Sequence, residues 1–285
     1  MSAAAKLPRV VDLPALSPVV MQLIATLGSD DVDARDIEGV IRRDPVIAAR
    51  VLSAANSAAY AGHMPAASIQ SAVMRLGLVT IRRLALLLSL NRAVPGSAAQ
   101  RTVFWRHSLA VAHATEVVIR EIPVWQPSGL PPEQAFVAAL LHDLGAMALM
   151  TCAEDDDARV RRVVAEAGVP RWQAEREVLG TDHAQIGATL AERWSFPPTI
   201  VEVIGVHHAL ADAPGEVRWI ATVVALADAL CSENEATGMG EGANVGMIEE
   251  AVAFLGLPPD ALGRIVDGTQ AEAARALTAL TDGRA

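Results

Sequence analysis

Apolar residues follow a helical pattern along most of the chain, because they recur three and four residues apart in one segment after another. These segments also carry helix start and stop signals. Ser17-Pro18 and Asp44-Pro45 each combine an N-capping side chain with a proline suited to the first helical turn. Gly77 closes a further segment, since glycine adopts the backbone conformations at which helices end. No segment convincingly predicts a strand and no repeat of solenoid length recurs, so the pattern predicts an all-α protein.

The predicted helices fall into two bundles. The first bundle occupies residues 7–92, and residues 93–100, which lack a periodic apolar face, are the expected linker. A second helical region covers residues 101–232. The polar, glycine-rich residues 233–244 are expected to form a flexible loop, and short helices complete the chain over residues 245–285.

Several segments of the second bundle bear on function. Residues 102–122 and 132–150 each have the apolar pattern of a long helix. Another helix is expected to begin at His183, because Asp182 suits the N-cap and a glutamine follows three residues later, as in a variant of the capping box. The acidic run Asp155–Asp157 is expected to stabilise the first turn of a further helix through the helix dipole.

Composition narrows the class of protein. Of the 285 residues, 52% are hydrophobic and 4% are aromatic, a mix that supports a sizeable core and favours helices over strands. The net charge of −10 disfavours broad binding to nucleic acid, so there is no strong case for a nucleic-acid partner. Cys152 and Cys231 are too few and too far apart in sequence to predict a disulfide framework.

The first residues and the apolar runs bear on location. Residues 1–14 lack the apolar core of a secretory signal peptide. The largely apolar stretch over residues 84–90 is far shorter than the roughly 20 residues that cross a bilayer. We therefore expect a cytoplasmic protein with no membrane association.

Histidine and aspartate side chains stand inside or beside these apolar, helix-patterned segments. Burying an imidazole or a carboxylate is costly unless the group is hydrogen-bonded, paired or bound to metal. A hydrogen bond to a backbone carbonyl would explain any one of these histidines, but so many polar groups in one core call for a shared explanation. Their nitrogen and oxygen donors suit a divalent transition metal. The predicted metal ligands are His107, His142, Asp143, His183, His207, His208 and Asp228.

Alternatives for some histidines stay open at this point. His183 can simply be a first-turn residue of its helix, and one ring of the His207-His208 pair can face solvent. His113 follows His107 by six residues and therefore lies on a different face of the same helix, which favours a structural role.

Motifs for other chemistries are missing from the sequence. There is no GxGxxG, no P-loop and no GxSxG, so nucleotide cradling by a glycine-rich loop and serine hydrolysis have no support. Neither cysteine has a second cysteine at the spacing of a metal site.

At the histidines and aspartates named above as metal ligands, and over nearly its whole length, the chain resembles the HD-related output domain (HDOD) proteins of bacteria. In the first half the similarity is carried by LPALSPVVMQLIATL, IRRDPVIAARVLSAANSAAY and SIQSAVMRLGLVTIRRLAL. In the second half it is carried by FWRHSLAVA, AFVAALLHDLG, EREVLGTDHAQIGATLAERWSFP, and VHH followed by LADAL. The resemblance implies an N-terminal helical bundle followed by a bundle related to the HD phosphohydrolases. It also implies a signalling or regulatory role, often without demonstrated catalysis.

The resemblance implies metal ligands as well. The basic HD ligand set is matched by His107, His142, Asp143 and Asp228. The extra ligands of two-metal members are matched by His183 and by one or both of His207 and His208. The chain is also similar to the HD-GYP phosphodiesterases, which cleave cyclic di-GMP, but it departs from them in two places. Ala146 stands where their HDxGK motif has lysine, and no GYP follows the histidine pair, so both departures argue against cyclic-dinucleotide cleavage.

These observations leave competing hypotheses of function. The one we favour is a bacterial regulatory HDOD protein that binds a signalling protein partner or a small ligand such as a nucleotide or cyclic dinucleotide. Its cofactor would be one or two divalent transition-metal ions, with iron or manganese favoured. The second is a metal-dependent phosphohydrolase or phosphodiesterase acting on a nucleotide or cyclic dinucleotide, in which Asp143 is a bridging ligand. Oxygen chemistry at a di-iron centre is a third.

Accessibility of the site would discriminate between the first two hypotheses. An open cavity lined by cations such as Arg106 or Arg193 would favour the enzyme, because a phosphate group needs access and positive charge. A metal site sealed by side chains would favour regulation.

Overall fold

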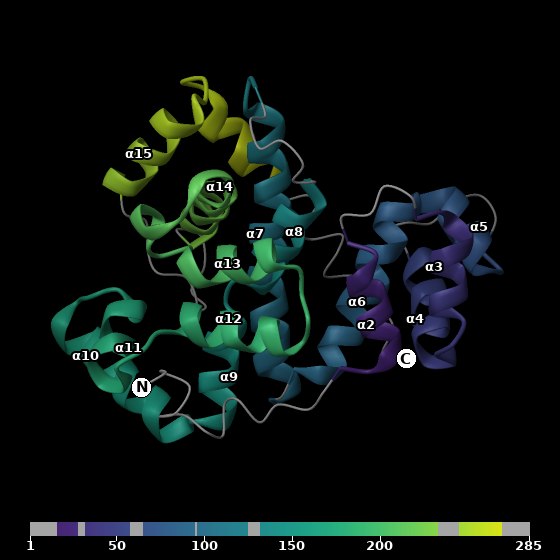
Figure 1. The fold of residues 1–285 in the computed structure, drawn as a ribbon, viewed down its shortest axis with the longest axis horizontal. Helices are drawn as coiled ribbons and strands as arrows, with labels where there is room; N and C mark the ends of the chain where they lie inside the picture. The colour runs from purple at the N-terminus through teal and green to yellow at the C-terminus, as the bar shows by residue number, and fades with distance from the viewer. Residues whose placement is uncertain are drawn as a thin grey trace. The chain divides into compact units, whose positions relative to one another are not determined.

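The computed structural model describes residues 16–27, 32–57, 65–94, 96–124, 132–232 and 245–269. Every regular element in these ranges is a helix, which confirms the all-α prediction (Figure 1). The chain divides into two compact units. Among the described residues, 16–94 form the N-terminal unit and 96–269 form the C-terminal unit. The loop predicted over residues 233–244 lies outside the described residues.

The N-terminal unit is a bundle of short helices with the predicted capping. Its helices are α2 (Pro18–Ala25), α3 (Ala34–Ile41), α4 (Pro45–Ala55), α5 (Ile69–Leu76) and α6 (Leu78–Ala93). The Ser17 hydroxyl accepts a hydrogen bond from the backbone N–H of Val20, and the Asp44 carboxylate accepts from two backbone N–H groups of α4. Gly77 has φ +81° and separates α5 from α6, as its position in the sequence predicts.

The core of this unit is formed by apolar faces that the helices turn toward one another. Helix α6 packs against α2, α3, α4 and α5 and so occupies the centre of the bundle. The side chains that are buried completely include Leu23, Ile37, Ile41, Val51, Ile81 and Leu90. Burial of such side chains is the main stabilising contribution to a bundle of this size.

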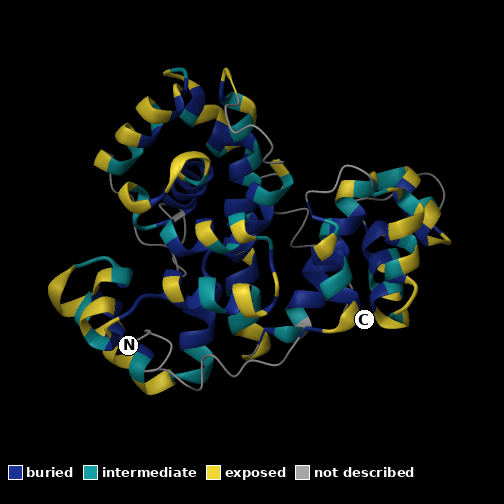
Figure 2. Ribbon diagram, in the orientation of Figure 1, coloured by how far each residue is buried: buried dark blue, intermediate teal, exposed yellow. Residues whose placement is uncertain are grey.

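The C-terminal unit contains longer helices and carries all the predicted metal ligands. Its elements are α7 (Ala98–Glu121), α8 (Pro132–Leu141), α9 (Leu144–Cys152), α10 (Glu154–Ala167), α11 (Arg171–Leu179), α12 (His183–Arg193), α13 (Pro198–Val206), the 3₁₀ helix η2 (Leu210–Asp212), α14 (Gly215–Ser232) and α15 (Val245–Leu255). Residues 261–269 are also helical. Helix α7 packs against α8 and α14, and α12 packs against α9 and α13. Figure 2 shows the buried faces of these helices turned toward the interior of the unit.

The segment predicted as one helix over residues 132–150 is in fact two. Helix α8 ends at Leu141, His142 and Asp143 form a turn, and α9 begins at Leu144. On a continuous helix adjacent side chains point about 100° apart, whereas a turn can direct both toward one place. Residues Pro132–Cys152 are long and apolar enough to pass as a membrane span by composition alone. However, 83% of the apolar window is buried inside the protein, as in the core of a helical bundle.

Helices α9 and α12 pack closely because glycines stand at their contact. A Cβ atom built on Gly145 would overlap the carbonyl oxygen of His183 and would lie 2.7 Å from the backbone nitrogen of Gly187. Only hydrogen atoms fit in this space, so Gly145 allows the backbones of the two helices to approach each other directly. The contact brings the first turn of α12 beside the turn that carries His142 and Asp143.

Candidate metal centre

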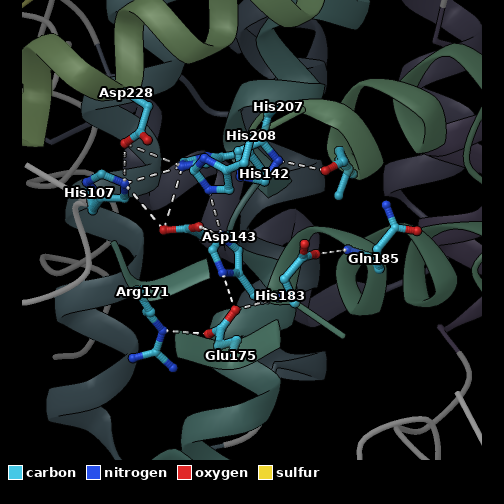
Figure 3. Close-up of polar contacts among 12 residues, drawn as sticks. His107, His142, Asp143, Arg171, Glu175, His183, Gln185, His207, His208 and Asp228 are labelled. Atoms are coloured by element: carbon cyan, nitrogen blue, oxygen red, sulfur yellow. Dashed lines mark hydrogen bonds and ion pairs between the residues drawn. The ribbon is translucent and has the colours of Figure 1, made fainter. Parts of the chain in front are cut away.

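The predicted ligands come from helices and turns that are far apart in sequence, and the fold brings them together (Figure 3). Helices α7, α12 and α14 contribute one ligand each, and the turns after α8 and α13 contribute two each. They are, in chain order, His107 on α7, His142 and Asp143 after α8, His183 on α12, His207 and His208 after α13, and Asp228 on α14. Every one of them is buried except His208, which is partly exposed.

One set of donors gathers around the ring nitrogen of His107. The Nε2 atom of His107 lies 3.3 Å from Nε2 of His142 and 3.2 Å from Oδ1 of Asp228. Oδ2 of Asp143 lies 3.5 Å from the same nitrogen of His107 and 3.6 Å from that of His142. We call His107, His142, Asp143 and Asp228 the first donor group. One ligand atom from each of His107, His142 and Asp143 lies within 4.8 Å of the others, a spacing that suits a single ion.

The remaining histidines form a second set beside the first. The Nε2 atoms of His183 and His208 are 2.9 Å apart, and ligand atoms of these two residues and of His207 all lie within 4.8 Å of one another. We call His183, His207 and His208 the second donor group. Oδ1 of Asp143 lies 3.3 Å from Nε2 of His183, so the Asp143 carboxylate presents one oxygen to each group. This is the arrangement that a bridging carboxylate requires.

Hydrogen bonds at the outer ring nitrogens fix the histidines in orientations that suit metal binding. His142 donates from Nδ1 to the carbonyl oxygen of Ala139 at 2.7 Å, and His207 donates from Nδ1 to that of Ile204 at 2.6 Å. With the proton held on Nδ1, Nε2 keeps its lone pair for a ligand. Nε2 of His207 is buried without a hydrogen-bond partner in the described part of the chain, which is costly unless something coordinates it. The residues therefore fit a divalent metal ion.

Neighbouring histidines keep both aspartates of the site ionised in spite of their burial. Burial by itself raises the pKa of Asp143, but the nearby rings of His142 and His183 outweigh burial and lower this pKa far below its ordinary value of 3.8. Burial likewise acts to raise the pKa of Asp228, and hydrogen bonds from His107 and His142 lower it well below 3.8. Both side chains are therefore carboxylates at neutral pH, the form that binds metal.

The histidines divide into two kinds by their protonation. Burial lowers the pKa of His207 to about 4 and that of His208 well below 6.5, so these rings are neutral at pH 7. Burial acts in the same direction on His183, but Glu175 and Asp143 together raise the pKa of His183 well above 6.5. Burial also acts to lower the pKa of His142, but the charge of Asp143 and the hydrogen bond that His142 donates to Asp228 raise it above 6.5. Without metal, protons on His142 and His183 offset the carboxylates, and ion binding must displace them.

The structure adds ionisable residues that the sequence did not single out. Glu175 and Arg171 on α11 are buried behind His183 (Figure 3). Glu175 accepts a 2.6 Å hydrogen bond from the Nδ1 atom of His183. Asp157 stands in the first turn of α10, as the sequence predicted. Its carboxylate is also buried and accepts a 2.6 Å hydrogen bond from Arg171, which the sequence did not predict. No local pattern predicts these pairs, because Glu175 meets its partner eight residues along the chain and Arg171 meets Asp157 across a helix–helix turn.

Comparison with known proteins agrees with this architecture. The model of the HDOD domain matches residues 13–210, which is more than two thirds of the chain. The chain belongs to the HDOD domain family. The HDOD match includes both donor groups except Asp228, which lies beyond its end on α14.

Solved structures of similar proteins cover almost all of this HDOD protein. An HDOD domain protein of unknown function from Geobacter sulfurreducens has a TM-score of 0.74 and 26% identity, and the match covers 96% of this chain and 98% of that one. A protein from Shewanella amazonensis SB2B named as a candidate phosphohydrolase also has a TM-score of 0.74 and 26% identity, with 98% of each chain covered. A protein of Treponema pallidum (strain Nichols) is 25% identical over 235 residues. The match covers 79% of this chain but 43% of that relative, so this chain spans less than half its length.

Proposed function

We propose that this HDOD protein is a bacterial signalling module that binds divalent transition-metal ions, iron or manganese, and acts by binding rather than by turnover. Its targets would be a protein partner or a small ligand such as a nucleotide. The observation that carries the proposal is the enclosure of the donors. His107, His142, Asp143, His183, His207 and Asp228 each expose 7% or less of their surface. An ion held there would tie together helices α7, α12, α13 and α14, so metal binding would stabilise this arrangement of helices.

The surroundings of the donors also favour binding over turnover. Ala146, at the position where HD-GYP phosphodiesterases have lysine, is buried on α9 and brings no charge to the site. The buried cation nearest in sequence to the second group, Arg171, already pairs with Glu175 and Asp157. Arg106 and Arg193, the sequence candidates for a cationic lining, are exposed, whereas the donors are buried. The position of the HD-GYP lysine and the sequence candidates for a cationic lining therefore add no buried cation beside the donor atoms.

Elemental analysis of the protein purified without chelator tests the metal-binding part of the proposal. We expect near-stoichiometric iron or manganese in the wild type, and its loss in the double variant His142→Ala, Asp143→Ala. His113→Ala is the matched control, because His113 lies on α7 but contacts Glu116 and Phe136 instead of the donors. Metal at about 100 times its dissociation constant should stabilise the fold by about 2.7 kcal/mol, measurable as a rise in unfolding midpoint. Folded wild type that takes up neither metal after reconstitution would overturn the proposal.

A metal-dependent phosphohydrolase or phosphodiesterase is the second candidate, and the position of Asp143 favours it. The carboxylate stands between the donor groups, where two-metal hydrolases place a shared ligand. His208 is partly exposed and its ring stacks on Trp172, so a phosphoester would approach the donors from this side. Bound divalent ions would supply an activated water and polarise a phosphoryl oxygen. The Shewanella relative, named as a candidate phosphohydrolase, is consistent with this alternative.

Turnover assays separate the two candidates. Protein loaded with manganese or iron is incubated with cyclic dinucleotides and a simple phosphodiester, beside Asp143→Ala as the inactive reference. The regulatory proposal expects no turnover above that reference although metal is present. Hydrolysis by the wild type that disappears in the variant would make the protein an enzyme.

A further inference from the structure

A second layer of buried charge lies behind the ring of His183 (Figure 3). Oε2 of Glu175 accepts two hydrogen bonds from His183. One comes from the backbone nitrogen of His183 at 2.7 Å, and the other comes from its ring Nδ1 atom at 2.6 Å. The first bond fixes the backbone at the first turn of α12, and the second fixes the ring. With both in place, Nε2 of His183 faces Asp143 and His208.

Glu175 is in turn held from its other side. Arg171 donates from Nε to Oε1 of Glu175 at 2.7 Å and from an Nη atom to Asp157 at 2.6 Å. Asp157 also pairs at 3.1 Å with Arg161, whose side chain is 67% exposed. A continuous series of ion pairs therefore runs from the surface of α10, through α11, to the metal ligand on α12. Each buried charge in it has an opposite charge beside it, which is the condition for burying such groups at all.

The partner of His183 differs in kind from the partners of its neighbours. The Nδ1 atoms of His142 and His207 meet neutral backbone carbonyls, whereas the Nδ1 atom of His183 meets a carboxylate. A carboxylate behind a coordinating imidazole fixes its tautomer and increases the electron density on the coordinating nitrogen. Removing such a partner commonly weakens metal affinity roughly 10- to 100-fold.

We propose that Glu175 is a positioning residue for the second donor group, held in place by Arg171 and Asp157, so that helices α10 and α11 set the metal affinity at His183. The inference rests on the metal binding proposed above. It predicts that the two donor groups respond differently to a change on α11, because the first group has no contact with Glu175 among the interactions of Figure 3.

The test is a calorimetric titration of the metal-free, full-length protein with Mn²⁺, supported by the absorption spectrum of the Co²⁺ form. The variant is Glu175→Gln, which preserves the size of the side chain and removes its charge. Glu177→Gln is the control, because Glu177 is exposed on the same helix. His107→Ala and His183→Ala identify which binding event belongs to which donor group.

We expect Glu175→Gln to weaken binding of the ion that His183→Ala removes by about 10- to 100-fold. The Co²⁺ spectrum of that site should change, and the affinity for the other ion should stay at its wild-type value. Glu177→Gln should titrate like the wild type. If Glu175→Gln binds both ions as tightly as the wild type, the positioning role is wrong while metal binding stands. If the wild type itself binds no Mn²⁺, Co²⁺ or iron, the proposed function fails and this inference fails with it.

A measurement on the wild type decides the matter should the Glu175→Gln chain not fold. Nitrogen NMR of the Zn²⁺-loaded protein reports which ring nitrogen of His183 carries the proton. We expect a proton on Nδ1 that exchanges slowly with water, because it is held by a buried carboxylate. An Nδ1 atom without a proton would overturn the inference.

Discussion

Asp143, directly before α9, and His183, at the start of α12, lie close together. Oδ1 of Asp143 is 3.3 Å from Nε2 of His183. The other carboxylate oxygen of Asp143 faces the first donor group, 3.5 Å from Nε2 of His107. Asp143 is therefore the point at which the two donor groups meet. Asp228 lies beside the first group, with its Oδ1 atom 3.2 Å from Nε2 of His107 and 3.7 Å from Nε2 of His142.

This difference predicts separate effects for the two aspartates. Asp143→Asn should weaken binding of both ions. The loss of affinity should exceed the roughly 10- to 100-fold that is typical of removing a residue behind a ligand. Asp228→Asn should weaken binding of the first ion by a larger factor than binding of the second, because its Oδ1 atom lies beside His107 and His142. A two-site titration with Mn²⁺ measures both constants, with the exposed Asp212→Asn as control. Equal losses at both sites in Asp228→Asn would contradict the assignment of ligands to groups.

The buried, neutral His207 predicts an acid-sensitive metal-free protein. Its pKa is about 4 in the folded chain against 6.5 when unfolded. The unfolded state therefore binds more protons between these values, and stability falls as the pH falls from 6.5 to 4. The loss amounts to roughly 3 kcal/mol at most, since one pKa unit corresponds to about 1.4 kcal/mol. The contribution of His207 is complete above pH 6.5.

Other groups titrate around His207, so the measurement compares two proteins. The raised pKa values of His142 and His183 affect stability in the opposite direction. Their stabilising contribution is present below pH 6.5 and is lost as the pH rises through the pKa values of the folded protein. The lowered pKa values of Asp143 and Asp228 matter below pH 3.8. Urea unfolding in chelator should show a smaller loss between pH 6.5 and 4 for His207→Gln than for the wild type. Parallel curves would show that His207 is not held neutral.

The contact between α9 and α12 predicts a large effect of one methyl group. Gly145→Ala would place a Cβ against the carbonyl oxygen of His183, and the backbones must separate to admit it. We expect a loss of about 1–3 kcal/mol in the free energy of unfolding, together with weaker metal binding, because the donors on the two helices move apart. Gly263→Ala is the control, since its added Cβ meets nothing within 4 Å in an exposed helical position. The control should be stabilised by about 0.4–1 kcal/mol. Chemical denaturation and metal titration measure both effects.

Replacing Asn56 should lower the stability of the N-terminal unit alone. Its side chain donates to the carbonyl oxygen of Ala66 at 2.9 Å and accepts from the backbone N–H of the same residue at 2.7 Å. Asn56→Ala removes both bonds and leaves the buried backbone groups of Ala66 without these partners, at a cost of about 1–3 kcal/mol. The exposed Gln70→Ala should be near neutral. Denaturation curves test the cost, and unchanged metal content in Asn56→Ala tests whether the effect stays within its unit.

Most of the helices and the chemistry of the donor residues can be predicted from the amino-acid sequence. Ser17 and Asp44 cap the helices they were predicted to cap, because capping depends on neighbours within three residues. The histidines and aspartates chosen as metal ligands are the residues that the fold brings together. Polar side chains in apolar helical segments must meet other polar groups once the segments pack, and that requirement is visible in the sequence.

How the donors divide into two groups depends on tertiary packing that the sequence pattern does not reveal. The turn at His142-Asp143 interrupts a segment whose apolar pattern is continuous, because both side chains are directed inward to the other donors. The division of the carboxylate oxygens of Asp143 between two groups depends on how closely α9 approaches α12. Glu175 meets His183 only because α11 folds back against α12. Periodicity and capping describe neighbours a few residues apart, whereas these contacts are set by the packing of whole helices.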